Sequence, residues 1–226
     1  MSPEDIYIAR FSTWTPGCTS ADEWRQWARG RREMLSSAEA PEIAFTDSLF
    51  RRRLSQISRM TIQVVHDLLP LKEDTKMIFL SFRGELSRQY NINRMQIQDK
   101  ALLHASFSLS VFNAPPALAS IALGLHGGYS ALYPGKNSFT AGLAAVKAAF
   151  LCGMTEELVF VYADEEVPAE YASLLPERPP PFAFGLLLAR ESGPGRIPLS
   201  SLNEEEESPA EFLKSLILCG DTHVSS

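Results

Sequence analysis

Cysteine and histidine are scarce in this sequence, and long apolar runs are missing. The three cysteines, Cys18, Cys152 and Cys219, are widely spaced and odd in number, which argues against a disulfide framework or a CxxC metal site. We therefore interpret them as reduced thiols, with Cys152 buried. No run of roughly 18 apolar residues occurs, and no apolar signal core follows the first ten residues. We expect a cytoplasmic protein without a membrane span.

Basic residues are too few for a nucleic-acid-binding protein. The chain has 21 Lys and Arg against 27 Asp and Glu, a net charge of -6. Three arginines, Arg51 to Arg53, stand together, and we leave open whether they form a solvated turn or have a function. The acidic group Asp164 to Glu166 has no His or Cys near it, so we expect a loop and a helix cap rather than a metal site, and no cofactor.

A hydrolase site is also missing. His126, Gly127 and Gly128 match the HGG oxyanion loop of α/β-hydrolases, but no GxSxG elbow exists in the chain. Only His223 lies downstream as a triad histidine. These absences exclude an esterase of that type.

What the sequence does contain is an alternation of apolar strands and helices. At 226 residues and 45% hydrophobic content, residues 1–226 are most simply one α/β domain. We expect five strands at 6–14, 76–82, 129–133, 156–163 and 182–190. We expect helices at 20–34, 55–69, 85–104 with a break near 91–93, 117–125, 137–152 and 210–218. Residues 204–226 would comprise an acidic run, that last short helix and a flexible tail.

The most informative stretch runs from Gly127 to Gly153. A short apolar strand, Tyr129 to Tyr133, ends at Pro134 and Gly135, and a buried helix follows that Asn137 or Ser138 can cap. Its apolar stripe consists of Phe139, Leu143, Val146 and Phe150. A strand that enters a helix through a sharp turn is a common place for a nucleophile, because the helix N-terminus lowers a thiol pKa there. This turn has no thiol.

This pattern resembles the N-terminal half of the β-ketoacyl-ACP synthases, which have the thiolase-like fold. Without a gap, the 27 positions from Gly127 to Gly153 keep both end glycines of the family segment and place Lys136 where the Cys nucleophile would be. The stretch RRRLSQISRMT resembles the opening of the first long helix in chain-length-factor-like relatives, and the spacing from Asn113 to Gly127 equals that of the family. The resemblance implies a thiolase-like half with a five-stranded mixed sheet of order 3-2-1-4-5.

In that order the strand Tyr129 to Tyr133 lies at an edge of the sheet. An exposed apolar edge is a template for pairing with another chain. The resemblance implies a dimer interface there, formed by Tyr129, Ser130, Ala131, Leu132, Tyr133 and Asn137.

Residues 106–113 alternate between serines and apolar side chains, which predicts an extended, half-buried segment. It resembles the family segment that crosses the dimer interface near the partner's acyl tunnel. The residues that would line or gate this tunnel are Phe107, Leu109, Val111 and Phe112. An ordinary sheet strand is the alternative interpretation.

The resemblance also implies what the chain cannot do by itself. The elbow nucleophile is replaced by Lys136, and the second half of a synthase, which supplies two catalytic histidines, is absent. We therefore expect a non-catalytic, chain-length-factor-like subunit, most like those of aryl polyene pathways, paired with a full-length β-ketoacyl-ACP synthase. The acidic net charge disfavours direct docking of an acidic acyl carrier protein, which would act through the partner. The alternatives are an enzyme with Lys136 as an amine nucleophile and a homodimeric acyl-binding or scaffold domain.

Overall fold

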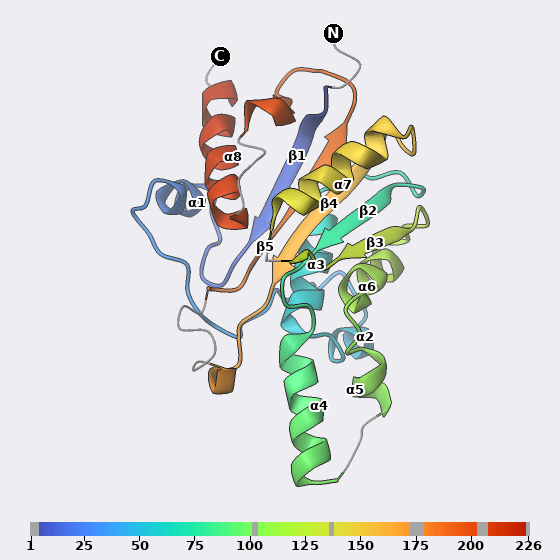
Figure 1. Cartoon of the computed structure of the whole chain (residues 1–226). Helices are drawn as coiled ribbons and strands as arrows, with labels where there is room; N and C mark the ends of the chain where they lie inside the picture. Colours follow the sequence, from blue (N-terminus) through green and yellow to red (C-terminus); the bar gives the residue numbers. More distant parts are fainter. Residues whose placement is uncertain (1–4, 101–103, 136–137, 172–178, 203–207, 225–226) are drawn as a thin grey trace.

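The protein is a sheet with helices on both of its faces (Figure 1). This computed structural model describes residues 5–100, 104–135, 138–171, 179–202 and 208–224. The strands are β1 (Tyr7–Trp14), β2 (Lys76–Leu80), β3 (Tyr129–Leu132), β4 (Glu157–Asp164), β5 (Phe182–Ala189) and β6 (Ile197–Pro198). Within the described ranges, every helix is too short or too polar to cross a membrane.

The strand order is β3-β2-β4-β5-β1-β6, which corrects the predicted order 3-2-1-4-5. β2 is parallel to β3 and β4, whereas β5 is antiparallel to both β4 and β1, so the sheet is mixed as expected. β4 and β5 lie in the centre of the sheet, and both of these strands are apolar on both faces. In β1, Arg10, Ser12 and Thr13 are polar, and polar residues suit a strand near an edge.

One face of the sheet is covered by α1 (Ala21–Ala28), α7 (Thr140–Leu151) and α8 (Pro209–Val224). The other face is covered by α3 (Gln56–His66) and α6 (Ala114–Leu123). Ser20 and Glu23 form a capping box at α1, and the Ser55 hydroxyl accepts the Ser58 N–H at α3. The helix α8 is longer than the predicted 210–218, and the acidic run 204–207 lies outside the described residues.

The remaining helices are α2 (Ser48–Arg51), α4 (Leu86–Gln98), α5 (His104–Ser108), η2 (Ala169–Tyr171) and η3 (Leu199–Ser201). α4 is continuous, so the predicted break near residues 91–93 is wrong. The extended segment predicted at 106–113 is also wrong, since it begins as α5 and continues as turns. The hydroxyls of Ser108 and Ser110 donate to the carbonyls of His104 and Phe107, local contacts that bring the chain back on itself and that an extended strand does not make.

Candidate functional site

Within the described part of the chain, the edge strand β3 has no partner strand along its outer side. It pairs with β2 on one side only, with Tyr129 beside Met77 and Ala131 beside Phe79. The carbonyls of Gly128 and Leu132 accept N–H groups from the β2 side. Because successive residues of a strand direct their N–H and C=O groups to alternate sides, Ala131 directs its own outward. The edge position predicted for this strand is confirmed.

The opposite edge of the sheet is protected, and β3 is not. At that edge, β6 covers only Tyr7 and Ile8 of β1, and the register shifts between Ile8 and Arg10. The Arg10 guanidinium donates to the carbonyls of Leu69 and Pro70. Bulges and inward charges are the devices that prevent edge-to-edge pairing. Residues Tyr129–Leu132 contain neither a charge nor a register shift. β3 is therefore the edge open to a partner strand.

An apolar groove of about 460 Å³ runs beside β3. Its lining includes Met77, Tyr129, Leu132, Ala148, Cys152 and Met154. Met154 in this lining is 56% exposed, and Leu151 at the end of α7 is 64% exposed. Tyr133 at the end of β3 is 65% exposed, and its ring contacts Phe112 on the α3 side of the sheet. Cys152 is exposed too, contrary to the prediction, because it lies past the last buried residue of α7. An apolar surface continuous with an open strand edge has the character of an interface core.

The turn between β3 and α7 is the elbow of the sequence pattern. Lys136 and Asn137 lie outside the described residues. The N-cap of α7 is Phe139 and not Asn137 or Ser138, and it provides no side-chain cap. The hydroxyls of Ser138 and Thr140 are hydrogen-bonded to each other at 2.5 Å. The elbow carries no thiol, since no cysteine occurs between Cys18 and Cys152.

The helix after the elbow lies close against the sheet. The Phe139 ring is fully buried, and its centroid is 5.0 Å from that of Phe212 and 5.8 Å from that of Phe160. A Cβ at Gly142 would approach Leu80 to 2.9 Å and Phe160 to 3.0 Å, so glycine lets α7 lie this close to the sheet without a shift of these side chains. The buried helix predicted for this stretch is confirmed.

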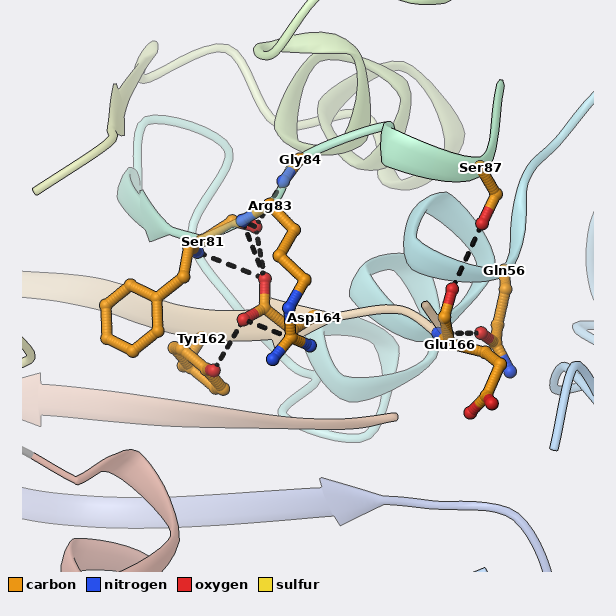
Figure 2. Close-up of polar contacts among 9 residues, drawn as sticks. Gln56, Ser81, Arg83, Gly84, Ser87, Tyr162, Asp164 and Glu166 are labelled. Carbon is orange, nitrogen blue, oxygen red and sulfur yellow. Dashed lines mark hydrogen bonds and ion pairs between the residues drawn. The ribbon is translucent and has the colours of Figure 1, made fainter. Parts of the chain in front are cut away.

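A buried polar network lies where β2 and β4 end, near the elbow (Figure 2). Oδ1 of Asp164 accepts the Ser81 hydroxyl at 2.6 Å and the N–H groups of Phe82 and Arg83, and Oδ2 accepts the Tyr162 hydroxyl at 2.8 Å. Burial raises the pKa of Asp164, which the Arg83 charge opposes, and burial together with Asp164 raises the pKa of Tyr162 well above its ordinary value. Sequence reasoning missed this network, whose only signal was the acidic group after β4.

The same acidic group caps a helix, as predicted. Oε1 of Glu165 accepts the Ser87 N–H at 2.7 Å in the first turn of α4. Among the described residues, no group of three or more His, Cys, Asp and Glu is placed to hold a metal ion.

The histidines are not gathered near the elbow. His66 stacks on Phe45 and contacts Asp67 at the end of α3. His104 lies on α5, and His126 precedes β3, at the end of that strand opposite the elbow. The side chain of His223 lies outside the described residues. No described histidine therefore stands beside the elbow as a base.

Two of the four predicted tunnel residues are exposed, and the other two pack against the core. Phe107 and Val111 are 56% and 49% exposed. Leu109 and Phe112 instead pack against the core on the α3 side of the sheet. The Phe112 ring lies 6.2 Å from Phe79 and 5.8 Å from Tyr133, and it covers Gly84 so closely that a Cβ there would approach it to 2.6 Å.

The arginine group Arg51 to Arg53 joins α2 to α3. Arg51 donates to the Ile43 carbonyl, whereas Arg52 and Arg53 are exposed. The Arg53 carbonyl accepts the Arg88 guanidinium, so the backbone of this turn supports the start of α4.

Residues 24–215 match the family described as "Beta-ketoacyl synthase, N-terminal domain". This match extends over more than half of the sequence, so the chain belongs to that family. A search of the curated proteins gives no match.

Solved structures with the same fold include a chain of "Ketosynthase (ApeO) in Complex with its Chain Length Factor (ApeC) from Xenorhabdus doucetiae". It is 22% identical with a TM-score of 0.73, and the match covers 94% of this chain and 91% of that chain. A chain of "The ishigamide ketosynthase/chain length factor" is 14% identical with a TM-score of 0.63, covering 86% and 64%. A chain of the AntDE:AntF complex, a type II polyketide synthase assembly, is 15% identical with a TM-score of 0.61, covering 82% and 63%. The thiolase-like half fold expected from the sequence is confirmed.

Proposed function

We propose that this protein is a non-catalytic, chain-length-factor-like subunit that pairs with a full-length β-ketoacyl-ACP synthase in the cytoplasm. The observation that carries the proposal is the unprotected edge β3, flanked by an apolar groove, beside an elbow that has no thiol. The open edge supplies a pairing surface. The elbow lacks the group that would accept an acyl chain.

The likeness to chains of ketosynthase complexes supports the same proposal. This chain spans about nine tenths of the matched chain in the ketosynthase and chain length factor complex from Xenorhabdus doucetiae. It spans 64% and 63% of the other two matched chains. The likeness to the chain from Xenorhabdus doucetiae and the family resemblance of the sequence support the aryl polyene type as the pathway we propose.

In the proposed complex, β3 would pair with the edge strand of the synthase across a two-fold axis and join both sheets. The interface would include Tyr129 to Tyr133 and Asn137, and we expect it to bury above roughly 2,000 Å², as obligate pairs do. Phe107, Leu109, Val111 and Phe112 would lie near the far end of the partner's acyl tunnel. The acyl carrier protein would dock on the synthase.

Co-expression with a candidate synthase tests this function directly. We expect the two chains to copurify as a heterodimer and to condense acyl units, and we expect this chain alone to show no condensation activity. A homodimer of this chain that excludes the synthase would contradict the proposal, because β3 would then pair with its own copy. Condensation by the isolated chain would favour the enzyme alternative.

Lys136 is predicted to be dispensable for condensation. A lysine at a helix N-terminus faces the unfavourable end of the helix dipole, so its amine is expected to point to solvent or to a partner carboxylate. The Lys136→Ala complex should therefore condense acyl units at the wild-type rate, measured at matched complex concentration. A loss of about a thousandfold with an intact heterodimer, equal to about 4 kcal/mol of transition-state stabilisation, would show that Lys136 takes part in the chemistry.

A further inference from the structure

The helices α4 and α5 form an arm that projects from the body of the protein (Figure 1). The only buried residue of α4 is Ile92, and Ile97 on the same helix is 79% exposed. The arm therefore has almost no apolar core of its own. Besides the contacts of Tyr90 with Glu170 and Tyr171, it is attached through the polar contacts at the start of α4, residues 85–88, which we term the root of the arm.

Two buried carboxylates hold this root. Glu85 is fully buried, and its Oε1 accepts the hydroxyls of Ser55 and Ser58 from α3 at 2.6 and 2.7 Å. Its Oε2 pairs with the Arg88 guanidinium at 2.9 Å. Glu165 is 1% exposed, and its Oε1 accepts the Ser87 N–H at 2.7 Å.

The backbone of the neighbouring residue completes the contact. The Ser87 hydroxyl donates to the Glu166 carbonyl at 3.1 Å, and the Glu166 N–H donates to the Gln56 side chain at 2.7 Å (Figure 2). The root is thus held against the end of β4 and the start of α3 at the same time. These contacts concern the chain alone and do not depend on the proposed function.

Glu85 and Glu165 differ in the hydrogen-bond donors and positive charges that surround their carboxylates. Glu85 has two hydroxyl donors and a charged guanidinium, whereas the donors to Glu165 are uncharged: the N–H at 2.7 Å and the hydroxyl of Ser87, and the N–H of Ile57. The cavity beside Glu165, about 760 Å³, is lined by serines from residues 36–37 and by Ser55 and Gln56 of α3, which are uncharged. The charged and titratable groups that face this cavity besides Glu165 are Arg88, Tyr90, Arg94, Glu166 and Glu170.

We propose that Glu165 is a proton-controlled latch that holds the root of the arm while it is protonated and loosens the arm when it loses its proton. A protonated Glu165 accepts the Ser87 N–H without adding a charge to the buried site. An ionised Glu165 places a second negative charge near Glu85 in a medium of low dielectric constant. Moving the root away from β4 relieves this repulsion, because water then solvates the carboxylate. The proton passes to solvent.

The direction of the pH effect follows from linkage. Burial first, and then the charge of Glu85, raises the pKa of Glu165 from 4.5 to about 7, while the Ser87 N–H opposes the shift. In the opened arm the carboxyl is hydrated and regains its ordinary pKa. The closed arm thus binds the proton more tightly than the open arm does. Opening should therefore become about tenfold more favourable per pH unit between roughly pH 5 and pH 7, and should level off above about pH 7.

Hydrogen exchange of the full chain, followed by mass spectrometry from about pH 5 to about pH 8, tests the latch. After correction for intrinsic exchange, protection of peptides from residues 86–98 should fall by about tenfold per pH unit up to about pH 7. Peptides from the later turns of α3, residues 60–66, which do not contact the root, serve as the internal reference and should not follow this trend. The Glu165→Gln variant keeps an oxygen acceptor for Ser87 without the titration, so its arm should stay protected at all these pH values.

The control variant is Glu166→Gln, in which the neighbouring carboxylate is removed while the backbone contacts of residue 166 remain. It should keep the wild-type pH profile. A flat wild-type profile, a slope that Glu165→Gln retains, or a slope shared by residues 60–66 would each overturn the proposal. The wild-type profile decides the question even if the Glu165→Gln protein does not fold, because the predicted slope and its plateau near pH 7 both belong to the unmodified chain.

Discussion

The Ala131→Pro variant is expected to keep its fold and to lose its synthase partner. Ala131 lies in β3 beside Phe79 of β2, but its N–H and C=O groups point to the free edge. Proline removes this outward N–H and adds a ring where a partner strand would lie. A buried acceptor left without its donor costs about 1–3 kcal/mol, which is about 5- to 150-fold in affinity, and the ring adds a steric term.

Two variants make this test specific to the outer side of β3. Ala131→Ser keeps the N–H group and should copurify with the synthase at wild-type yield. Ser130→Pro removes an N–H on the side that faces β2, so it should lower the thermal stability of the chain itself. The measurements are copurification yield and the melting temperature of the isolated variants. Recovery of the Ala131→Pro complex at wild-type yield, with a normal melting temperature, would argue against edge pairing.

Removing the Phe107 ring is expected to lengthen the product of the complex without destabilising the chain. Phe107 is 56% exposed and thus contributes little to the core. Its ring is several ångströms across, so the alanine variant should admit about one further two-carbon unit if the ring closes the tunnel. The product-length distribution, measured by mass spectrometry at matched complex concentration, gives the result.

Phe112 should behave differently, because its ring packs between Phe79 and Tyr133 over Gly84. Phe112→Ala is expected to lower the free energy of unfolding by about 3 kcal/mol and to change product length as well. Ile97→Ala is the matched control, since Ile97 is exposed on the same arm and has no proposed tunnel role. Normal heterodimers with unchanged products from both phenylalanine variants would mean that this segment does not line the tunnel. The subunit would then be a scaffold for its partner.

The sequence by itself determined the elements whose signals are local. The stripe Phe139, Leu143, Val146 and Phe150 predicted the buried helix α7, and all four residues are buried against the sheet. The uninterrupted apolar runs in β2, β4 and β5 predicted strands that are covered on both faces. The edge place of β3 and the missing thiol at the elbow also follow from the sequence and its family resemblance. These features depend on residue type and spacing, which is why they were predictable.

Only the tertiary structure decided how distant segments meet. The polar residues of β1 suit a place near an edge, but its pairing with β5 is a long-range contact that residues 6–14 do not encode locally. The short alternation at 106–113 fits a strand or a turn of helix equally well, and the absence of a neighbouring strand within the described arm favours the helix α5. The two carboxylates at the root of the arm come together from positions 80 residues apart in the chain, Glu85 and Glu165. Burial and charge arise from that proximity, so their effect on the pKa of Glu165 could be found only in the folded chain.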